Sequence, residues 1–283
     1  MTRKELFEEC VLALAEHEIP DSRFDVMCIF EDVLGERWAI SDTRQEIPPE
    51  KEAEVRRMTA LRLAGQPLQY ILGQWEFWSL PVKVGEGVLI PRPDTETLVE
   101  ETLRICRGIG WRSPKIADLC SGSGCIALAL KKELPEAEIY ALELSEAALD
   151  YLRQNAELNA LDIKIMRGDV LSAETAELLP ELDLIVSNPP YLTAEEMGEL
   201  QEEVRREPES ALYGGEDGLD FYRAMTPLWK NKLKNGGFLC YEFGMGQHDT
   251  IGKILAGNGF DNLKFSRDGG GIVRTVTAWK TED

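Results

Sequence analysis

From Lys115 onward, short apolar runs alternate with segments of helical periodicity, and this alternation limits the possible folds more than any other feature. The pattern predicts strands near residues 115–119, 138–142, 163–167, 182–186 and 238–243, with helices near 124–134, 145–158 and 218–234. Strands that alternate with helices form βαβ units, in which helices cover both faces of a mostly parallel sheet. Residues 261–266 and 272–279 flank a glycine-rich turn and predict a final antiparallel hairpin.

Residues 1–65 predict helices only. A capping-box pattern at Thr2 and Glu5 precedes an apolar stripe at helical spacing, and a third helix is expected from Pro49 to Gly65. A second stripe falls on Phe24, Met27, Phe30 and Leu34. The period changes to two between Trp75 and Val84, which predicts a hairpin. We therefore expect a helical domain over residues 1–73, a β-hairpin linker over 74–90 and an α/β domain over 91–283.

Charge and cysteine content exclude several classes of function. Lys and Arg total 31 against 51 Asp and Glu, a net charge of −20, so no direct DNA binding through phosphate contacts is expected. No apolar stretch approaches the ~20 residues of a membrane span. The amino terminus has no apolar signal-peptide core. Six scattered cysteines without a C-x-x-C pair, and only two histidines, predict no metal site and a reducing, cytoplasmic location.

The first motif with chemical content is Asp118-Leu119-Cys120-Ser121-Gly122-Ser123-Gly124, directly after a predicted strand. Open α/β sheets bind ligands outside the carboxyl ends of their strands. Gly122 and Gly124 allow the backbone to approach a ligand closely, and the next helix directs its N–H groups to the same place. Glu143 ends the second strand, where a carboxylate can accept the hydroxyls of a ribose. These features predict an adenosine-containing cofactor but leave a dinucleotide open.

The second motif is Asn188-Pro189-Pro190-Tyr191, after the fourth strand of the α/β part. Proline fixes φ and holds the preceding residue extended, so Asn188 is expected in one rigid conformation. Asn188 offers an amide oxygen, Pro189 a free carbonyl and Tyr191 an aromatic face. The pattern predicts a pocket that grips a planar NH₂ group by its two hydrogens.

The two motifs together resemble S-adenosylmethionine-dependent methyltransferases that act on amino nitrogens. Within this group the chain is similar to the release factor glutamine methyltransferases over nearly its whole length. The shared segments also include Pro67–Gly73, Glu76-Phe77, Leu89–Glu96 and Gly214–Leu219. The sequence departs from the common pattern at two positions, with Cys120 in place of glycine and Glu143 in place of aspartate.

The resemblance implies S-adenosyl-L-methionine as cofactor, S-adenosyl-L-homocysteine as product, and methylation of the Gly-Gly-Gln glutamine of peptide chain release factors, which supports translation termination. Asn188, Pro189 and Tyr191 are the expected catalytic residues, and they form the substrate site together with Pro190. Cofactor contacts are expected from Asp118, Cys120, Ser121, Gly122, Ser123, Gly124, Glu143, Asp169, Val170 and Asn188. The helical domain is expected to recognise the protein substrate, and the enzyme to be a monomer.

Two other substrates remain open at this point, and so does a non-enzymatic binding protein on this scaffold, although such a protein would not need Asn188-Pro189-Pro190-Tyr191. A ribosomal-protein glutamine methyltransferase would use the same chemistry, and a DNA adenine-N6 methyltransferase would use the same pocket on a flipped base. The acidic chain disfavours DNA. Arg92, between two prolines, suits either a cofactor carboxylate or a salt bridge at the domain junction. No general base is assigned near Asn188.

Overall fold

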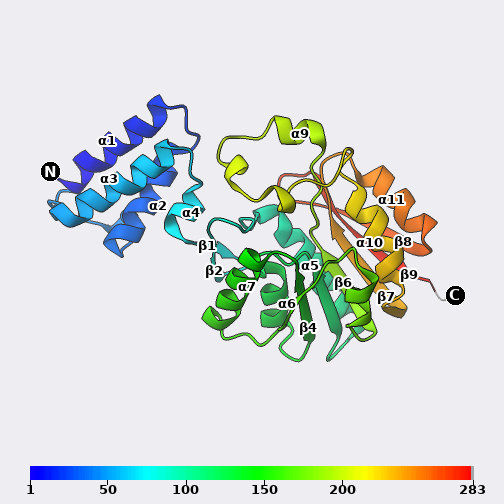
Figure 1. The fold of residues 1–283 in the computed structure, drawn as a ribbon. Coiled ribbons are helices and arrows are strands. Elements are labelled where there is room, and N and C mark those ends of the chain that lie inside the picture. The colour runs from blue at the N-terminus through cyan, green and yellow to red at the C-terminus, as the bar shows by residue number, and fades with distance from the viewer. Residues whose placement is uncertain (282–283) are drawn as a thin grey trace. The chain divides into compact units, whose positions relative to one another are not determined.

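Two units make up the chain in the computed structural model, which describes residues 1–281 (Figure 1). The helical unit comprises Met1–Gln74 together with Gln201–Arg206. The α/β unit comprises Trp75–Leu200 and Glu207–Asp283. The second unit is therefore interrupted by a short segment that the chain contributes to the first.

Two helices of the helical unit begin at recognisable sequence signals. Thr2 caps the first helix in a full capping box with Glu5, and Pro49 occupies the first turn of the third. Its elements are α1 (Arg3–Glu16), α2 (Ser22–Leu34), η1 (Trp38–Ile40), α3 (Pro49–Leu63), α4 (Leu68–Leu72) and the returning η3 (Val204–Arg206). The buried ring of Phe7 stacks on Trp38, with ring centroids 4.3 Å apart.

The buried face of α2 differs from the expected stripe. Phe30 is buried, but Phe24 is 46% exposed, and Val26 and Ile29 occupy the core instead. Helical spacing allows either set, since Val26, Ile29 and Phe30 also recur at intervals of three and four.

A buried ion pair crosses the same core. Arg62 on α3 contacts Asp25 on α2 at 2.6 Å, with both side chains 8% exposed. Arg62 also contacts Glu203 of the returning segment at 2.6 Å. One guanidinium therefore joins two helices and the returning segment within this unit.

The hairpin follows, with β1 at Gln74–Phe77 and β2 at Leu80–Lys83. Trp78 and Ser79 form its two-residue turn, with φ of 52° and 53°. Positive φ at both central positions defines a type I′ turn, whose twist matches that of paired strands. Asn155, which is fully buried, accepts a hydrogen bond from Lys83 N at 2.6 Å and donates one to Lys83 O at 3.1 Å. The hairpin is thus fixed to a helix of the α/β unit.

The α/β unit is a seven-stranded sheet in the order β5-β4-β3-β6-β7-β9-β8, and only β9 runs against the others. This confirms the predicted fold class. The strands are β3 (Lys115–Leu119), β4 (Glu138–Glu143), β5 (Lys164–Arg167), β6 (Leu182–Ser187), β7 (Leu233–Glu242), β8 (Phe260–Arg267) and β9 (Val273–Lys280).

Helices cover both faces of this sheet (Figure 1). One face carries α5 (Glu96–Ile109), α6 (Cys125–Glu133) and α7 (Glu146–Leu158), and the other carries α8 (Ala173–Glu177), α10 (Asp220–Lys230) and α11 (His248–Gly257). Short elements η2 (Pro93–Thr95), α9 (Ala194–Gly198) and η4 (Glu209–Ala211) lie in connections. Trp229, Tyr222 and Tyr241 are the largest fully buried side chains and belong to the core beneath α10.

The sequence misplaced one boundary in this unit and missed one helix. The helix expected over 218–234 ends at Lys230, and β7 begins at Leu233 rather than near 238. Gly236, with φ 76°, lies inside the strand rather than in a turn before it. Helix α11 was not predicted. Its buried residues Ile251 and Leu255 have helical spacing, but Gly252 and Gly257 weaken the signal.

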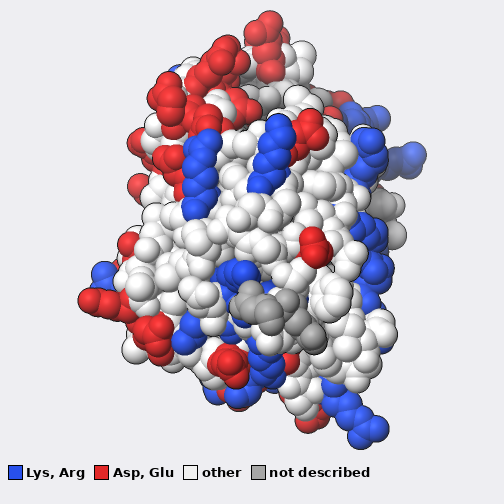
Figure 2. Space-filling model, turned by 90° about the vertical axis from the view of Figure 1, so that its right-hand side faces the viewer, with Lys and Arg blue, Asp and Glu red and all other residues white. Residues whose placement is uncertain are grey.

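Charge is unevenly distributed on the face that Figure 2 shows. Asp and Glu side chains gather toward the upper left, Lys and Arg lie mainly along the right and lower edges, and most of the centre is uncharged. The net charge of −20 is therefore not spread evenly over this face.

Candidate active site

The parallel strands β3, β4, β5 and β6 end at the same edge of the sheet, and a cavity lies there. β3 pairs with β4 on one side and β6 on the other, with Leu119 opposite Ser187. The loops that follow these strands therefore begin side by side. They line a cavity of about 340 Å³, within the ~300–1,000 Å³ typical of small-molecule sites.

Most of the residues expected from sequence line this cavity. They are Cys120, Ser121, Gly122, Ser123, Glu143, Asp169, Val170, Asn188 and Pro190. Asp118, Gly124, Pro189 and Tyr191 are not among the lining residues. Asp118 and Pro189 are buried, and Tyr191 is half-buried against the core under α10.

The glycines of the first motif have different roles. Gly122 has a φ of 54°, and a Cβ placed on it would meet no atom within 4 Å, so its backbone faces open space. Gly124 has a φ of 82°, and a Cβ there would lie 2.4 Å from Leu152 Cδ1. Gly122 therefore leaves room for a ligand, whereas Gly124 allows α6 to pack closely on α7.

Cys120 adopts the conformation that glycine would favour. Its φ is 62°, in the left-handed region where a Cβ costs about 1–2 kcal/mol. Cys120 is half-buried at the cavity wall, and desolvation raises the pKa of its thiol well above the usual value. The loop therefore keeps its shape at this position despite the substitution, with the strain stored in the backbone.

Asp118 anchors the loop from below. Its side chain is fully buried, and Oδ2 accepts a hydrogen bond from Ala127 N at 3.2 Å in the first turn of α6. Oδ1 is buried without a hydrogen-bond partner among the described residues. Burial raises the pKa of this carboxyl to about 7.

Glu143 is held against the loop. Oε2 accepts a hydrogen bond from Gly122 N at 2.8 Å, and Oε1 accepts bonds from Leu144 N at 2.7 Å and Ser145 N at 2.8 Å. A carboxylate has about four acceptor positions, so room remains for a hydroxyl donor. Asp169 and Val170, after β5, line the same cavity, and Asp169 Oδ1 accepts a hydrogen bond from Leu171 N at 2.8 Å.

Asn188 stands at the boundary between β6 and the cavity. Ser187, just before it, is fully buried and donates a hydrogen bond to Leu119 O at 2.5 Å, which joins the starts of the two loops. Asn188 Nδ2 donates to Thr95 Oγ1 at 3.3 Å. With Nδ2 directed to Thr95, the amide oxygen is the group of Asn188 left to accept a ligand hydrogen.

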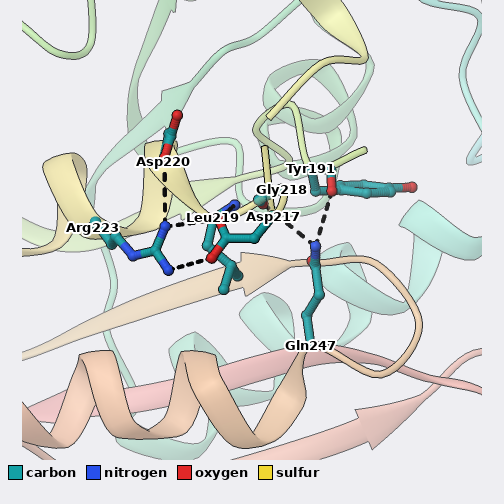
Figure 3. Close-up of polar contacts among 7 residues, drawn as sticks. All are labelled: Tyr191, Asp217, Gly218, Leu219, Asp220, Arg223 and Gln247. Carbon is teal, nitrogen blue, oxygen red and sulfur yellow. Dashed lines mark hydrogen bonds and ion pairs between the residues drawn. The ribbon is translucent and has the colours of Figure 1, made fainter. Parts of the chain in front are cut away.

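The segment Gly214–Leu219 supports the proline motif from behind (Figure 3). A Cβ on Gly218 would lie 2.2 Å from Tyr191 O, and one on Gly214 would lie 2.6 Å from Pro190 O. Gln247 Nε2 donates to Tyr191 O at 2.9 Å and to Gly218 O at 3.4 Å. These glycines let a second loop contact the backbone of the motif directly.

That second loop is itself tied to α10 (Figure 3). Arg223 pairs with Asp217 at 2.5 Å and with Asp220 at 3.5 Å, at the exposed start of the helix. Asp217 Oδ1 also accepts a hydrogen bond from Leu219 N at 3.3 Å. The support behind Tyr191 therefore extends to the first turn of α10.

Arg92 is engaged in an ion pair. It contacts Glu207, whose side chain is 1% exposed and whose Oε2 accepts a hydrogen bond from Ile90 N at 2.9 Å. Both residues belong to the α/β unit, and Arg92 also lines the cavity. The salt-bridge interpretation thus describes the contact present, although the pair lies inside one unit rather than at a domain junction.

Sequence reasoning missed several residues around the site. Glu242, at the end of β7, is 1% exposed, and its carboxyl faces Thr95 and Asn188 as hydrogen-bond donors. Burial raises the pKa of Glu242 to about 7. Further lining residues are Gly87–Leu89, Pro91, Thr95, Leu142, Leu144, Ser145, Ala148, Leu171, Pro208, Ser210, Ala211 and Phe221. The β6–β7 register places Tyr241 opposite Ser187, a proximity that no sequence pattern reveals.

The donor set fits an adenosine-containing cofactor. Gly122 leaves open space beside the loop, Glu143 presents a carboxylate, and apolar side chains from β4, α7 and the loop after β5 offer walls for a base. Among residues 1–281, no group of three or more His, Cys, Asp or Glu side chains could hold a metal ion.

In the described part of the chain, no helix has the length and apolar character needed to cross a membrane.

Comparison with protein families gives two matches. The PrmC N-terminal domain matches residues 5–73, and the methyltransferase small domain matches residues 95–215. The boundaries fall close to those of the helical unit and inside the α/β unit.

Comparison with individual proteins agrees. A release factor glutamine methyltransferase of Fusobacterium nucleatum is 36% identical over 98% of this chain and 78% of its own length. One from Geobacter sulfurreducens is 39% identical over 93% of this chain and 91% of its own. A methyltransferase structure from Pyrococcus furiosus, 16% identical, covers 82% of this chain and 99% of its own with a TM-score of 0.55. The last match concerns the fold alone.

Proposed function

The chain belongs to the release factor glutamine methyltransferase family, and on that premise we propose that it methylates the N5 side-chain nitrogen of the Gly-Gly-Gln glutamine of peptide chain release factors. The methyl donor is S-adenosyl-L-methionine, and the product is S-adenosyl-L-homocysteine. The enzyme acts as a cytoplasmic monomer and supports translation termination.

One observation carries the proposal: β3 and β6 are adjacent, so the glycine loop and Asn188 open into the same cavity. A methyl transfer requires donor and acceptor to lie within a few ångströms and in line. Two loops that start from neighbouring strands in register bring the two expected binding sites to one cavity, which supports this arrangement.

The expected cofactor residues divide into three groups. Residues 120–124, with Asp118 beneath them, hold the polar end of the cofactor through backbone groups. Glu143 binds the ribose hydroxyls, and Asp169 and Val170 border the adenine. The bound cofactor supplies a strongly electrophilic methyl group, so the protein needs to add little chemical activation.

The remaining task is to present a weak nucleophile. The lone pair of a glutamine amide nitrogen is delocalised into its carbonyl group. Asn188 Oδ1 and the Pro189 carbonyl accept the two N–H groups of the substrate, which aims the nitrogen and favours its pyramidal form. The same oxygens stabilise the positive charge that develops on nitrogen. Pro190 and Tyr191 complete the substrate pocket.

The helical domain over residues 1–73 serves to recognise the protein substrate, and the hairpin over 74–90 links it to the α/β domain. Deletion of residues 1–70 should leave cofactor binding in place and abolish methylation of an intact release factor. Undiminished methylation by the truncated protein would contradict this role.

The decisive experiment is methyl transfer from labelled S-adenosylmethionine to one of three substrates: a release factor, ribosomal proteins or adenine-containing DNA. We expect label on the release factor glutamine, located by peptide mass spectrometry. Label only on ribosomal protein or DNA would refute the substrate assignment.

Variants of Asn188 test its role in the same assay. Asn188→Ala leaves a substrate N–H unpaired, which costs about 1–3 kcal/mol, and loses charge stabilisation that is worth ~10²–10³ in rate at comparable sites. Single-turnover rates should fall in the order wild type, Asp, Ala, since a carboxylate still accepts hydrogen bonds. Calorimetry should show near-normal cofactor binding in both variants. A wild-type rate for the Ala variant would refute the role.

A further inference from the structure

Glu242 is a buried carboxyl group, and the proposed methyl transfer assigns it no role. It is the last residue of β7 and 1% exposed. One of its oxygens, Oε2, is buried without a hydrogen-bond partner among the described residues. Burying a carboxylate in this way is costly, and such groups concentrate at functional sites.

The contacts of Glu242 lead to the substrate-facing side chain. Thr95 is 2% exposed, and its side chain lies beside the Glu242 carboxyl, where, as a hydrogen-bond donor, it lowers the pKa of that carboxyl. The Thr95 hydroxyl oxygen also accepts the hydrogen bond from Asn188 Nδ2 at 3.3 Å. The Asn188 side chain also lowers the pKa of the carboxyl, less than Thr95 does. Three side chains from η2, the loop after β6 and β7 thus form one network.

The Glu242 carboxylate determines which groups of Thr95 and Asn188 act as donors. A carboxylate only accepts, so it draws the Thr95 hydroxyl hydrogen toward itself. The lone pairs of that hydroxyl are then left for Asn188, and only the NH₂ end of the Asn188 amide can meet them. The Asn188 oxygen is consequently turned the other way.

We propose that Glu242 is a positioning residue, whose carboxylate fixes the Thr95 hydroxyl and thereby holds Asn188 with its amide oxygen toward the methyl acceptor. The proposal rests on the proposed function, because it assigns Asn188 Oδ1 as the acceptor of a substrate N–H. A protonated Glu242 can donate to Thr95, and the Thr95 hydroxyl is then free to donate to Asn188 Oδ1. The amide loses its fixed orientation in that state.

Several charged and titratable groups from neighbouring elements face Glu242. Arg274 on β9, paired with Asp268 at 3.3 Å, favours the carboxylate, and Asp94 on η2 opposes it. Tyr191, Tyr222 and Cys125 also face it, and burial raises the pKa of each of these groups, so they stay neutral. Asp118 shares a raised pKa of about 7, so wild type must be compared with a Glu242 variant.

The first arm of the test needs no methylation. In the protein labelled with ¹⁵N, the Asn188 side-chain NH₂ signals are identified by their loss in Asn188→Asp. We expect these signals to shift with pH, with a midpoint near 7 in wild type, and to lose that dependence in Glu242→Gln. Signals that do not respond to pH, or respond equally in Glu242→Gln, would overturn the proposal.

The second arm measures methylation of a release factor at saturating cofactor and substrate. Glu242→Gln keeps the shape but can donate to Thr95, so we expect the rate to fall about 10²-fold, with little change in cofactor affinity. The wild-type rate should rise with pH through about 7, and this rise should be absent in Glu242→Gln. Wild-type rates in Glu242→Gln would overturn the proposal.

Thr95 provides the matched control. Thr95→Val should lower the rate as Glu242→Gln does, and Thr95→Ser should restore most of it, because serine retains the hydroxyl. Thr102→Val makes the same change at a fully buried threonine of α5, whose hydroxyl bonds Leu98 O at 2.8 Å, and should leave the rate unchanged. In an Asn188→Ala background, Glu242→Gln should add no further loss, whereas additive losses would contradict the network.

The two arms separate the possible failures. A wild-type protein that does not methylate release factors, but whose Asn188 signals titrate through Glu242, would refute the proposed function and leave the network established. A wild-type protein that methylates, without any effect of Glu242→Gln, would refute the positioning role alone.

Discussion

Glu242 should also make the folded state less stable as pH rises, and Glu242→Gln should remove this effect. The carboxyl is 1% exposed, and its pKa is raised from 4.5 to about 7, first of all by burial. The folded state therefore binds a proton that the unfolded state has already released between these two values. Stability gained from that proton is fully present below pH 4.5 and is lost as pH rises through 7.

The magnitude follows from the shift. Each pKa unit corresponds to about 1.4 kcal/mol, so the change from 4.5 to about 7 amounts to about 3 kcal/mol. We expect the free energy of unfolding of wild type to decline against that of Glu242→Gln by about this amount across the interval, with no further divergence above pH 8. A constant offset between the two proteins does not affect the comparison.

Urea unfolding at a series of pH values would measure this difference. The intrinsic fluorescence of Trp229, which is fully buried and whose Nε1 donates to Val170 O at 2.7 Å, reports on the α/β unit when the other tryptophans are replaced by phenylalanine. Glu138→Gln, at a carboxyl group of the same sheet whose side chain is 33% exposed, is the control for a general charge effect. Parallel stability curves for wild type and Glu242→Gln would refute the reasoning.

Three further changes test separate features. Cys120→Gly should be more stable than Cys120→Ala by about 1 kcal/mol in urea unfolding, because both lack the thiol and only glycine relieves the φ of 62°; equal stabilities would show that no strain is stored there. Gly218→Ala places a Cβ 2.2 Å from Tyr191 O and should lower methylation at least tenfold, while Gly246→Ala, with φ 85° and open space around it, should not; equal rates for the two variants would contradict the supporting role of the loop. Arg62→Met leaves the Asp25 carboxyl buried without its partner and should destabilise the helical unit by about 3–5 kcal/mol, seen as an earlier unfolding transition by circular dichroism; an unchanged transition would indicate that Asp25 is protonated in the wild type.

The sequence predicted the sheet well because strand and helix periodicities differ clearly and the connections are short. It failed where a local signal conflicted with pairing. Gly236 and Gly237 resemble a turn before a strand, but pairing with β6 begins already at Leu233. In α11 two glycines masked the helical spacing of Ile251 and Leu255.

The candidate site was predictable to the extent that it depends on contiguous motifs. The glycine loop and Asn188 follow strands directly, so the sheet rule places them together. Glu242 and Thr95 lie far from both motifs along the chain, and each has an ordinary explanation there, as a strand-end acid and a helix-start threonine. Their contact with Asn188 depends on the register of β6 with β7 and on the path of η2, and neither is encoded in a local pattern.

The pairing of β3 with β6 separates the part of the enzyme that must stay constant from the part that can vary. Leu119 lies opposite Ser187, so the level at which the two loops leave the sheet is set by backbone hydrogen bonds and by no side chain in either loop. Exchanges within the segment between Tyr191 and Gly214 can therefore alter which protein is accepted without moving the reacting atoms. An evolving or engineered enzyme of this architecture could acquire a new substrate by replacing that segment while keeping the same chemistry.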